Sequence, residues 1–170
     1  MTERVFVDTN VLVYARDSRY PQKQKTAADR LKTLWHSRSG RTSVQVLSEY
    51  YVTLTRKLKP GIPPEDAWDD VQSFMSWEPQ SIDGEVIIRA RELERRYKAS
   101  WWDATVIAAA QIQSCTVLLS EDLQHGMAFG SLLVLNPFVQ SVGERDEAYA
   151  TLAAAPRPLH RPRGRPSRKV

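Results

Sequence analysis

The sequence contains little cysteine and shows no metal-binding pattern built on sulfur. Cys115 is the only cysteine among 170 residues, so an intrachain disulfide is excluded and the residue is expected to be buried. The three histidines, His36, His125 and His160, show no ligand spacing, which leaves no His–Cys cluster for zinc. The sequence therefore indicates neither a zinc protein nor a disulfide-stabilised one.

Glycine-rich turns and long apolar runs are also missing. A dinucleotide-binding enzyme needs a glycine-rich turn directly after its first strand, and none of the seven glycines lies before position 40. The longest largely apolar stretch, from Ala104 to Ile112, is too short to cross a bilayer, and no basic start followed by an apolar run is present. We therefore expect a cytoplasmic protein with no membrane partner.

The composition suits one globular domain followed by a basic tail. With 42% hydrophobic residues, a chain of this length can bury a substantial core, and helical and strand patterns alternate as in a βαβ architecture. We expect an α/β domain over residues 1–150 and a Pro/Arg-rich disordered tail over residues 151–170. The net charge is +4, but residues 156–170 alone carry six Arg or Lys and no acid. The rest of the chain is thus slightly acidic, with two net negative charges.

Within this tail, residues 161–166 resemble the core of an AT-hook, in which an extended Arg-Gly-Arg segment enters the minor groove of DNA. The basic residues of this segment are Arg161, Arg163 and Arg165. A narrow minor groove has a strongly negative potential that attracts arginine. A general electrostatic tether for DNA or RNA, or an incidental basic tail, fits the same composition.

Four acids are placed where a parallel sheet would bring them to one edge. Asp8 follows a β-rich run at residues 5–7, and Asp122 follows another at residues 116–119. Glu49 and Asp103 lie in the first turns of predicted helices, the first of them after a predicted strand at residues 41–44. Ligands bind at the carboxyl edge of such sheets. Because clustered carboxylates repel one another, we expect them to hold hard divalent cations, Mg²⁺ or Mn²⁺.

Asp8 and Glu49 also have purely structural interpretations. Asp8 can cap the helix that begins near Thr9, but Thr9 and Asn10 offer the same capping chemistry, so this turn has more caps than it needs. That surplus favours a functional Asp8. Glu49 taken alone would be a solvent-exposed glutamate interacting with a helix dipole, and it gains weight only from the other three acids.

Asp103 has a stronger structural interpretation, because Ser100 and Asp103 are spaced as a capping box. Yet Asp103 is the only ionisable residue in the stretch 101–113, which is apolar almost all round and therefore expected to be buried. A buried charge needs a partner, and a bound metal would serve. Capping and coordination are compatible, since a carboxylate has two oxygens.

These motifs together resemble PIN-domain ribonucleases, specifically VapC-type toxins of toxin–antitoxin pairs. The resemblance runs from about Val5 to Phe138 and rests on the order of five short motifs. They are DTN at 8–10, SE at 48–49, a lone Asp103 in an alanine-rich helix, SED at 120–122 and LNPF at 135–138. It implies a three-layer α/β/α fold with a central, mostly parallel sheet of four to five strands.

The resemblance also implies the site and the activity. It aligns Asp122 with the family's fourth acid, a choice between Glu121 and Asp122 that the residues alone leave open. The implied catalytic and metal ligands are Asp8, Glu49, Asp103 and Asp122. Thr9, Asn10 and Ser120 are expected to hydrogen-bond these ligands, and Glu121 either supports them in the same way or points away from the site. One or two cations would activate a water that hydrolyses RNA. Trp101 or Trp102 could stack on a base, although both also suit a core.

The implied partners are RNA, a VapB-like antitoxin and a second copy of the chain. Alternatives are a housekeeping RNA-processing nuclease with the same fold and a non-catalytic protein that binds nucleic acid through its tail. A haloacid-dehalogenase-type phosphatase is disfavoured, because Asn10 stands where its second aspartate would be.

The tail generates the first testable prediction. Truncation after Ala155 should leave the melting temperature and metal dependence unchanged, because the tail lacks the apolar residues of a core. Binding of RNA or DNA at low salt should weaken, and the slope of log affinity against log salt should become shallower. An unchanged slope would show that the tail does not contact nucleic acid, and a lost melting transition would show that it packs on the domain.

Overall fold

The computed structural model describes residues 3–139 of the chain. The expected domain boundary at residue 150 and the basic tail, with Arg161, Arg163 and Arg165, lie outside the described residues. The fold and the candidate site are therefore built from the part of the chain that the resemblance covers.

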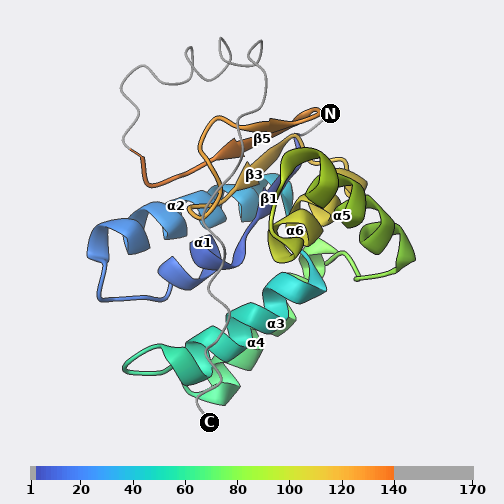
Figure 1. Cartoon of the computed structure of the whole chain (residues 1–170). Helices are drawn as coiled ribbons and strands as arrows, with labels where there is room; N and C mark the ends of the chain where they lie inside the picture. The colour runs from blue at the N-terminus through green and yellow to red at the C-terminus, as the bar shows by residue number, and fades with distance from the viewer. Residues whose placement is uncertain (1–2, 140–170) are drawn as a thin grey trace.

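A five-stranded sheet of order β2-β1-β3-β5-β4 forms the centre of the molecule (Figure 1). Val7 of β1 pairs with Leu119 of β3, and Leu119 pairs in turn with Leu135 of β5, so these strands end at one common edge. All pairings are parallel except that of β4 with β5. The strands are β1 (Val5–Val7), β2 (Gly40–Arg41), β3 (Val117–Leu119), β4 (Ala128–Phe129) and β5 (Leu132–Leu135).

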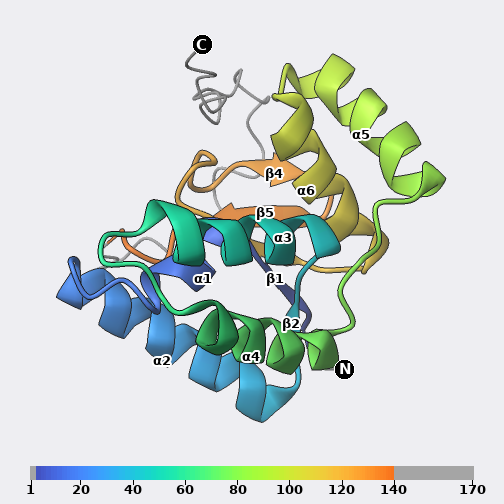
Figure 2. The same ribbon diagram turned by 90° about the horizontal axis from the view of Figure 1, so that it is seen from below.

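Helices cover the sheet on both sides. In Figure 1, α1 and α2 lie on one side of the sheet and α5 and α6 on the other, and Figures 1 and 2 both show α3 and α4 side by side. The predicted mostly parallel sheet between helices is confirmed. The helices are α1 (Thr9–Tyr14), α2 (Pro21–Ser37), α3 (Val44–Val52), α4 (Pro64–Phe74), α5 (Gly84–Tyr97) and α6 (Trp101–Ile112), with a π-helical turn at Thr53–Lys57 and a 3-10 turn at Met75–Trp77.

Helix α6 is the buried central helix. Every residue from Asp103 to Ala110 is buried, because the helix is apolar on all sides and lies under α5. Its start is set by Ser100, whose hydroxyl accepts a hydrogen bond from the Asp103 N–H, so the predicted serine cap is present. Among residues 3–139, no helix combines the length and the apolar character needed to span a membrane.

The predicted strand at residues 41–44 is wrong beyond Arg41. The strand ends at Arg41, and α3 begins at Val44 because the Ser43 hydroxyl accepts a hydrogen bond from the Val46 N–H. A serine in extended conformation before a helix stops the strand and satisfies an orphan amide. Glu49 consequently lies in the second turn of α3, one turn later than expected.

Close packing explains two residues of the core. Gly40 lies against Trp77, and a Cβ at position 40 would be 2.5 Å from the indole ring, so only glycine fits there. Cys115 is buried, as predicted, and burial raises the pKa of its thiol to about 12. The thiol therefore stays protonated and serves as a small apolar residue.

Asp17 closes the turn between α1 and α2. It is only 5% exposed, and its carboxylate accepts hydrogen bonds from the Arg19 backbone N–H at 3.1 Å and from the Arg19 guanidinium at 2.7 and 2.9 Å. The guanidinium hydrogen bonds outweigh burial and hold the pKa of Asp17 below its ordinary value.

This depressed pKa predicts a pH-dependent stability. In the unfolded chain Asp17 should titrate near an ordinary pKa of about 4, so its contribution is complete above that pH and is lost as the pH falls through the lower folded value. At pH 7, Asp17→Asn should lower the melting temperature by roughly 2–4 °C. The difference from wild type should shrink between about pH 5 and 2; a difference that is constant over this range would rule out the charge as its cause.

Candidate active site at the carboxyl edge of the sheet

Asp8 is the fully buried centre of the candidate site. It follows β1 and caps α1, because its Oδ1 accepts a hydrogen bond from the Thr9 N–H at 2.8 Å. Its Oδ2 accepts one from the Ser120 hydroxyl at 2.8 Å and one from the Asn10 amide at 3.4 Å. Asp8 therefore does cap α1. Its second carboxylate oxygen also accepts hydrogen bonds from Ser120 and Asn10, which capping does not require.

Glu49 is connected to Asp8 through Thr9. The Thr9 hydroxyl donates to Glu49 Oε2 at 2.9 Å, and the Gln45 amide donates to Glu49 Oε1 at 3.1 Å. Gln45 precedes Glu49 by one helical turn, so both side chains lie on the same face of α3. These contacts orient the Glu49 carboxylate toward α1.

The loop after β3 is held against α1 by backbone and side-chain bonds. The Asp8 N–H donates to the Leu119 carbonyl at 3.0 Å, and Asn10 Oδ1 accepts the Glu121 N–H at 3.1 Å. The Ser120 hydroxyl also accepts the Asp122 N–H at 3.2 Å. The predicted DTN and SED motifs therefore touch, as the neighbouring strands β1 and β3 require.

Asp103 reaches the same edge from the other face of the sheet. A tight turn at residues 113–116 joins α6 to β3, so the helix runs opposite to the strand and its first turn lies toward the carboxyl edge. Asp103 is 5% exposed, and its Oδ2 accepts a hydrogen bond from the Ser100 hydroxyl at 2.8 Å. Of the two adjacent tryptophans, Trp102 is about half exposed and Trp101 packs partly against the core.

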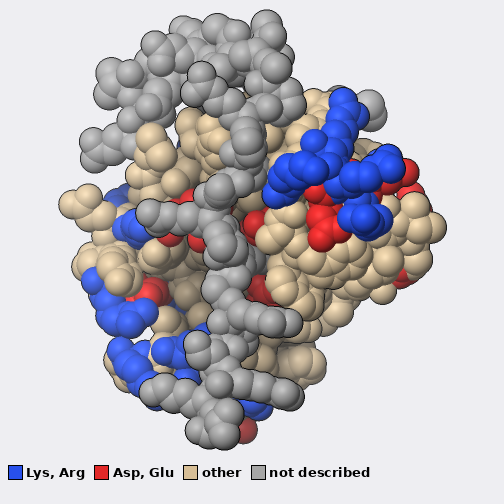
Figure 3. Space-filling model, viewed as in Figure 1, with Lys and Arg blue, Asp and Glu red and all other residues tan. Residues whose placement is uncertain are grey.

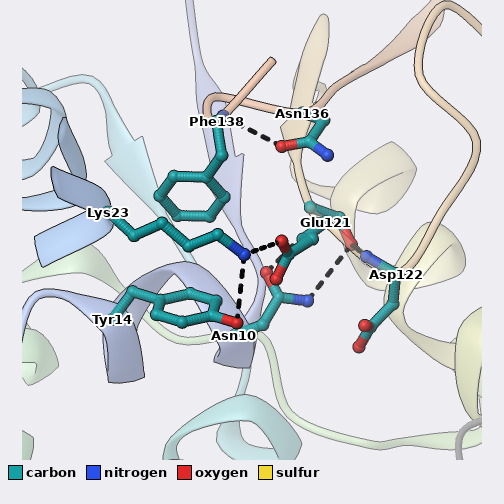
Figure 4. A network of polar contacts seen from close by, with 8 residues as sticks. Asn10, Tyr14, Lys23, Glu121, Asp122, Asn136 and Phe138 are labelled. Atoms are coloured by element: carbon teal, nitrogen blue, oxygen red, sulfur yellow. Dashed lines mark hydrogen bonds and ion pairs between the residues drawn. The ribbon is translucent and has the colours of Figure 1, made fainter. Parts of the chain in front are cut away.

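Three contacts of the site were not predicted from the sequence. Gln45 orients Glu49, and its spacing of four residues on one helix was a signal that could have identified it. Lys23 of α2 forms an ion pair with Glu121 and donates to the Tyr14 hydroxyl at 3.3 Å (Figure 4). No local pattern connects these residues, because Lys23 and Glu121 are 98 positions apart.

The donor chemistry suits a hard divalent cation, since all four predicted ligands are carboxylates. Asp8 and Glu49 are joined through Thr9, whose N–H donates to Asp8 and whose hydroxyl donates to Glu49. The Ser120 hydroxyl joins Asp8 to the loop of Asp122. Within residues 3–139, however, no three His, Cys, Asp or Glu side chains form a preassembled metal centre. Coordination by all four acids, and the supporting roles of Thr9, Asn10, Ser120 and Glu121, therefore stay predictions.

Solved structures with the same fold come from toxin–antitoxin systems. A toxin–antitoxin complex from Klebsiella pneumoniae superposes with a TM-score of 0.59 at 17% identity, covering 79% of this chain and 98% of its own. VapC20 of Mycobacterium tuberculosis, described as a toxin that cleaves the sarcin–ricin loop, gives 0.51 at 23% identity, covering 69% and 91%. VapBC2 from Rickettsia felis, bound to a promoter DNA fragment, gives 0.53 at 16% identity, covering 78% and 97%. No curated protein matches the sequence.

The order and direction of the strands define an α/β fold with a mostly parallel sheet between helices. The family model of the PIN domain matches residues 5–126, which is most of the described chain. This chain belongs to the PIN domain family. The predicted resemblance is thereby confirmed at the level of the family and the fold.

The metal site is tested most directly by thermal shift. Mg²⁺ or Mn²⁺ at about a hundredfold excess over its Kd should raise the melting temperature by roughly 5–10 °C. Asp8→Asn and Asp103→Asn should abolish this increment, because each removes a ligand charge while keeping the side chain's shape. Asp29→Asn, which alters an exposed acid on α2 paired with Lys25, is the matched control and should keep it.

The capping interpretation makes the opposite prediction. If Asp103→Asn unfolds the protein while Asp8→Asn keeps the full metal-induced increment, both acids serve the helix starts only.

Proposed function

We propose that this chain is a divalent-cation-dependent endoribonuclease and the toxin of a VapBC-type toxin–antitoxin pair. The observation that carries the proposal is the buried Asp8 carboxylate at the sheet edge of a PIN-domain protein. Thr9 links it to Glu49, and Ser120 links it to the SED loop. A fully buried acid that accepts hydrogen bonds from the Thr9 N–H at its own helix start and from the Ser120 hydroxyl of the SED loop is more than a helix start needs.

The residues of the chain would hold and orient the cation. Asp8, Glu49, Asp103 and Asp122 are the proposed ligands of one or two Mg²⁺ or Mn²⁺ ions. Bound there, the cation supplies an activated water and neutralises charge that develops on the phosphate oxygens. Thr9, Asn10 and Ser120 keep the carboxylates in place, and the carboxylates themselves are not nucleophiles. Cleavage is expected to leave a 5′-phosphate and a 3′-hydroxyl.

An acidic site needs positive charge nearby to attract RNA. Figure 3 shows Lys and Arg gathered over the part of the surface formed by α5, which packs against α6 and thus against the helix of Asp103. Attraction of the phosphate backbone is largely electrostatic and independent of sequence. We propose this patch as a contribution of the domain to RNA binding. Helix α5 carries Arg89, Arg91, Arg95 and Arg96, of which Arg89 and Arg91 form ion pairs with Glu85 and Glu94.

The proposed partners follow from the structural neighbours. Two of the similar structures are toxin–antitoxin complexes, and the third is a toxin described as cleaving the sarcin–ricin loop. For this chain we propose an RNA substrate, a VapB-like antitoxin that covers the acidic site with a cationic side chain, and a homodimer. Carboxylates that lack a metal favour such a cation.

Cleavage and toxicity are tested separately. The purified full chain should cleave RNA only with Mg²⁺ or Mn²⁺, and Asp8→Asn should reduce the rate by at least about a hundredfold, the scale of losing a group that stabilises the transition state. Asp29→Asn should cleave as wild type. Expression in the native host should arrest growth, and co-expression of a small neighbouring gene should relieve the arrest.

Two outcomes would point to the alternatives. Metal-dependent cleavage by a folded chain that is harmless in its own host would favour a housekeeping nuclease. Binding of nucleic acid that disappears on removal of the tail, with no cleavage under any condition, would favour the non-catalytic protein.

A further inference from the structure

The two adjacent acids of the SED loop face different ways. Figure 4 shows the Glu121 carboxylate directed toward Lys23 of α2, whereas the Asp122 side chain points away from that lysine. The sequence alone left both acids as possible ligands. In the structure, the side chains of Glu121 and Asp122 therefore differ in the direction in which they point.

The Lys23–Glu121 ion pair is enclosed by aromatic rings. The Lys23 ammonium lies 4.5 Å from the centroid of the Tyr14 ring and 5.3 Å from that of Phe138, and these two rings pack edge to face. Only 33% of the lysine side chain and 26% of the glutamate side chain are exposed. Burial by itself lowers the pKa of Lys23, but the hydrogen bonds that Lys23 donates to Glu121 and Tyr14 hold this pKa above its ordinary value. The attraction is thus less screened than in an exposed pair.

Glu121 is held at its backbone as well as at its side chain. Its N–H donates to Asn10 Oδ1 at 3.1 Å, and the next N–H, of Asp122, donates to the Ser120 hydroxyl. With the carboxylate anchored by Lys23, the loop is attached both to α1 and to α2. A loop held at two points has few ways to exchange one acid for the other.

We propose that Lys23 is a positioning residue that holds the Glu121 carboxylate away from the cation site, so that Asp122 is the acid this loop presents there. The anchoring of the loop follows from the apo geometry alone. The assignment of Asp122 to a cation rests on the proposed function. Without Lys23, Glu121 would be a further negative charge next to Asp8 and Asp122, free to compete for the metal.

The anchoring is tested in the metal-free full chain by amide hydrogen exchange. Lys23→Met should speed exchange at residues 120–123 by roughly fivefold, the scale of losing one partly buried ion pair. Lys25→Met is the matched control, since this lysine lies on the same helix and pairs with Asp29 in solvent. It should leave the loop unchanged, and Lys23→Arg should preserve protection. If Lys23→Met speeds amide exchange in the loop no more than Lys25→Met does, or if the faster exchange extends uniformly through α6, Lys23 does not anchor the loop.

The choice of acid is tested by titrating the same proteins with Mn²⁺ alone. Lys23→Met should bind Mn²⁺ roughly three- to tenfold more tightly, because it releases an additional carboxylate as a ligand. The double variant Lys23→Met/Glu121→Gln should return to the wild-type affinity. If Lys23→Met binds Mn²⁺ with the wild-type affinity, or if the double variant binds Mn²⁺ as tightly as Lys23→Met does, Lys23 does not keep Glu121 from the cation site. If wild type itself binds no Mn²⁺, the proposed function fails, while the exchange experiment still decides the anchoring.

Discussion

The buried charge of Asp8 is the constraint on which the arrangement of the site depends. A carboxylate removed from water is costly unless hydrogen-bond donors replace its solvent. Here the donors come from its own helix start and from Ser120, which is more than a hundred residues away in sequence. They reach Asp8 because β1 and β3 are neighbours whose ends coincide at Val7 and Leu119. The pairing of β1 with β3 and the need of the Asp8 carboxylate for hydrogen-bond donors therefore favour the same arrangement of the two strand ends.

The same edge joins elements that otherwise belong to different layers. Thr9 carries the network from α1 to Glu49 on α3, and Asn10 carries it to the SED loop. On the far side, Lys23 connects that loop to α2 and to the aromatic pair of Tyr14 and Phe138. Charged and polar side chains that are partly shielded from water form a rigid network when each of them is hydrogen-bonded. Such rigidity would suit the proposed cation site.

Sequence reasoning recovered the parts of the fold that local patterns encode. The apolar runs at β1 and β3 and the caps at Asp8 and Ser100 depend on neighbours within four residues. The strand expected at residues 41–44 was wrong beyond Arg41. The Ser43 hydroxyl caps α3, so the helix begins at Val44 and the β-rich run does not continue as a strand.

For the candidate site, the sequence by itself determined which residue types are available, in what order they occur and at which strand or helix ends they lie. That was enough to identify the PIN-domain family, while the role of the four acids as metal ligands stays a prediction. Only the tertiary structure decided how those ends meet: that Thr9 bridges Asp8 and Glu49, and that Glu121 turns to a lysine 98 positions away. The physical reason is that periodicity and capping act within a few residues. Partners of a buried charge are chosen instead by which segments the sheet brings within hydrogen-bond distance.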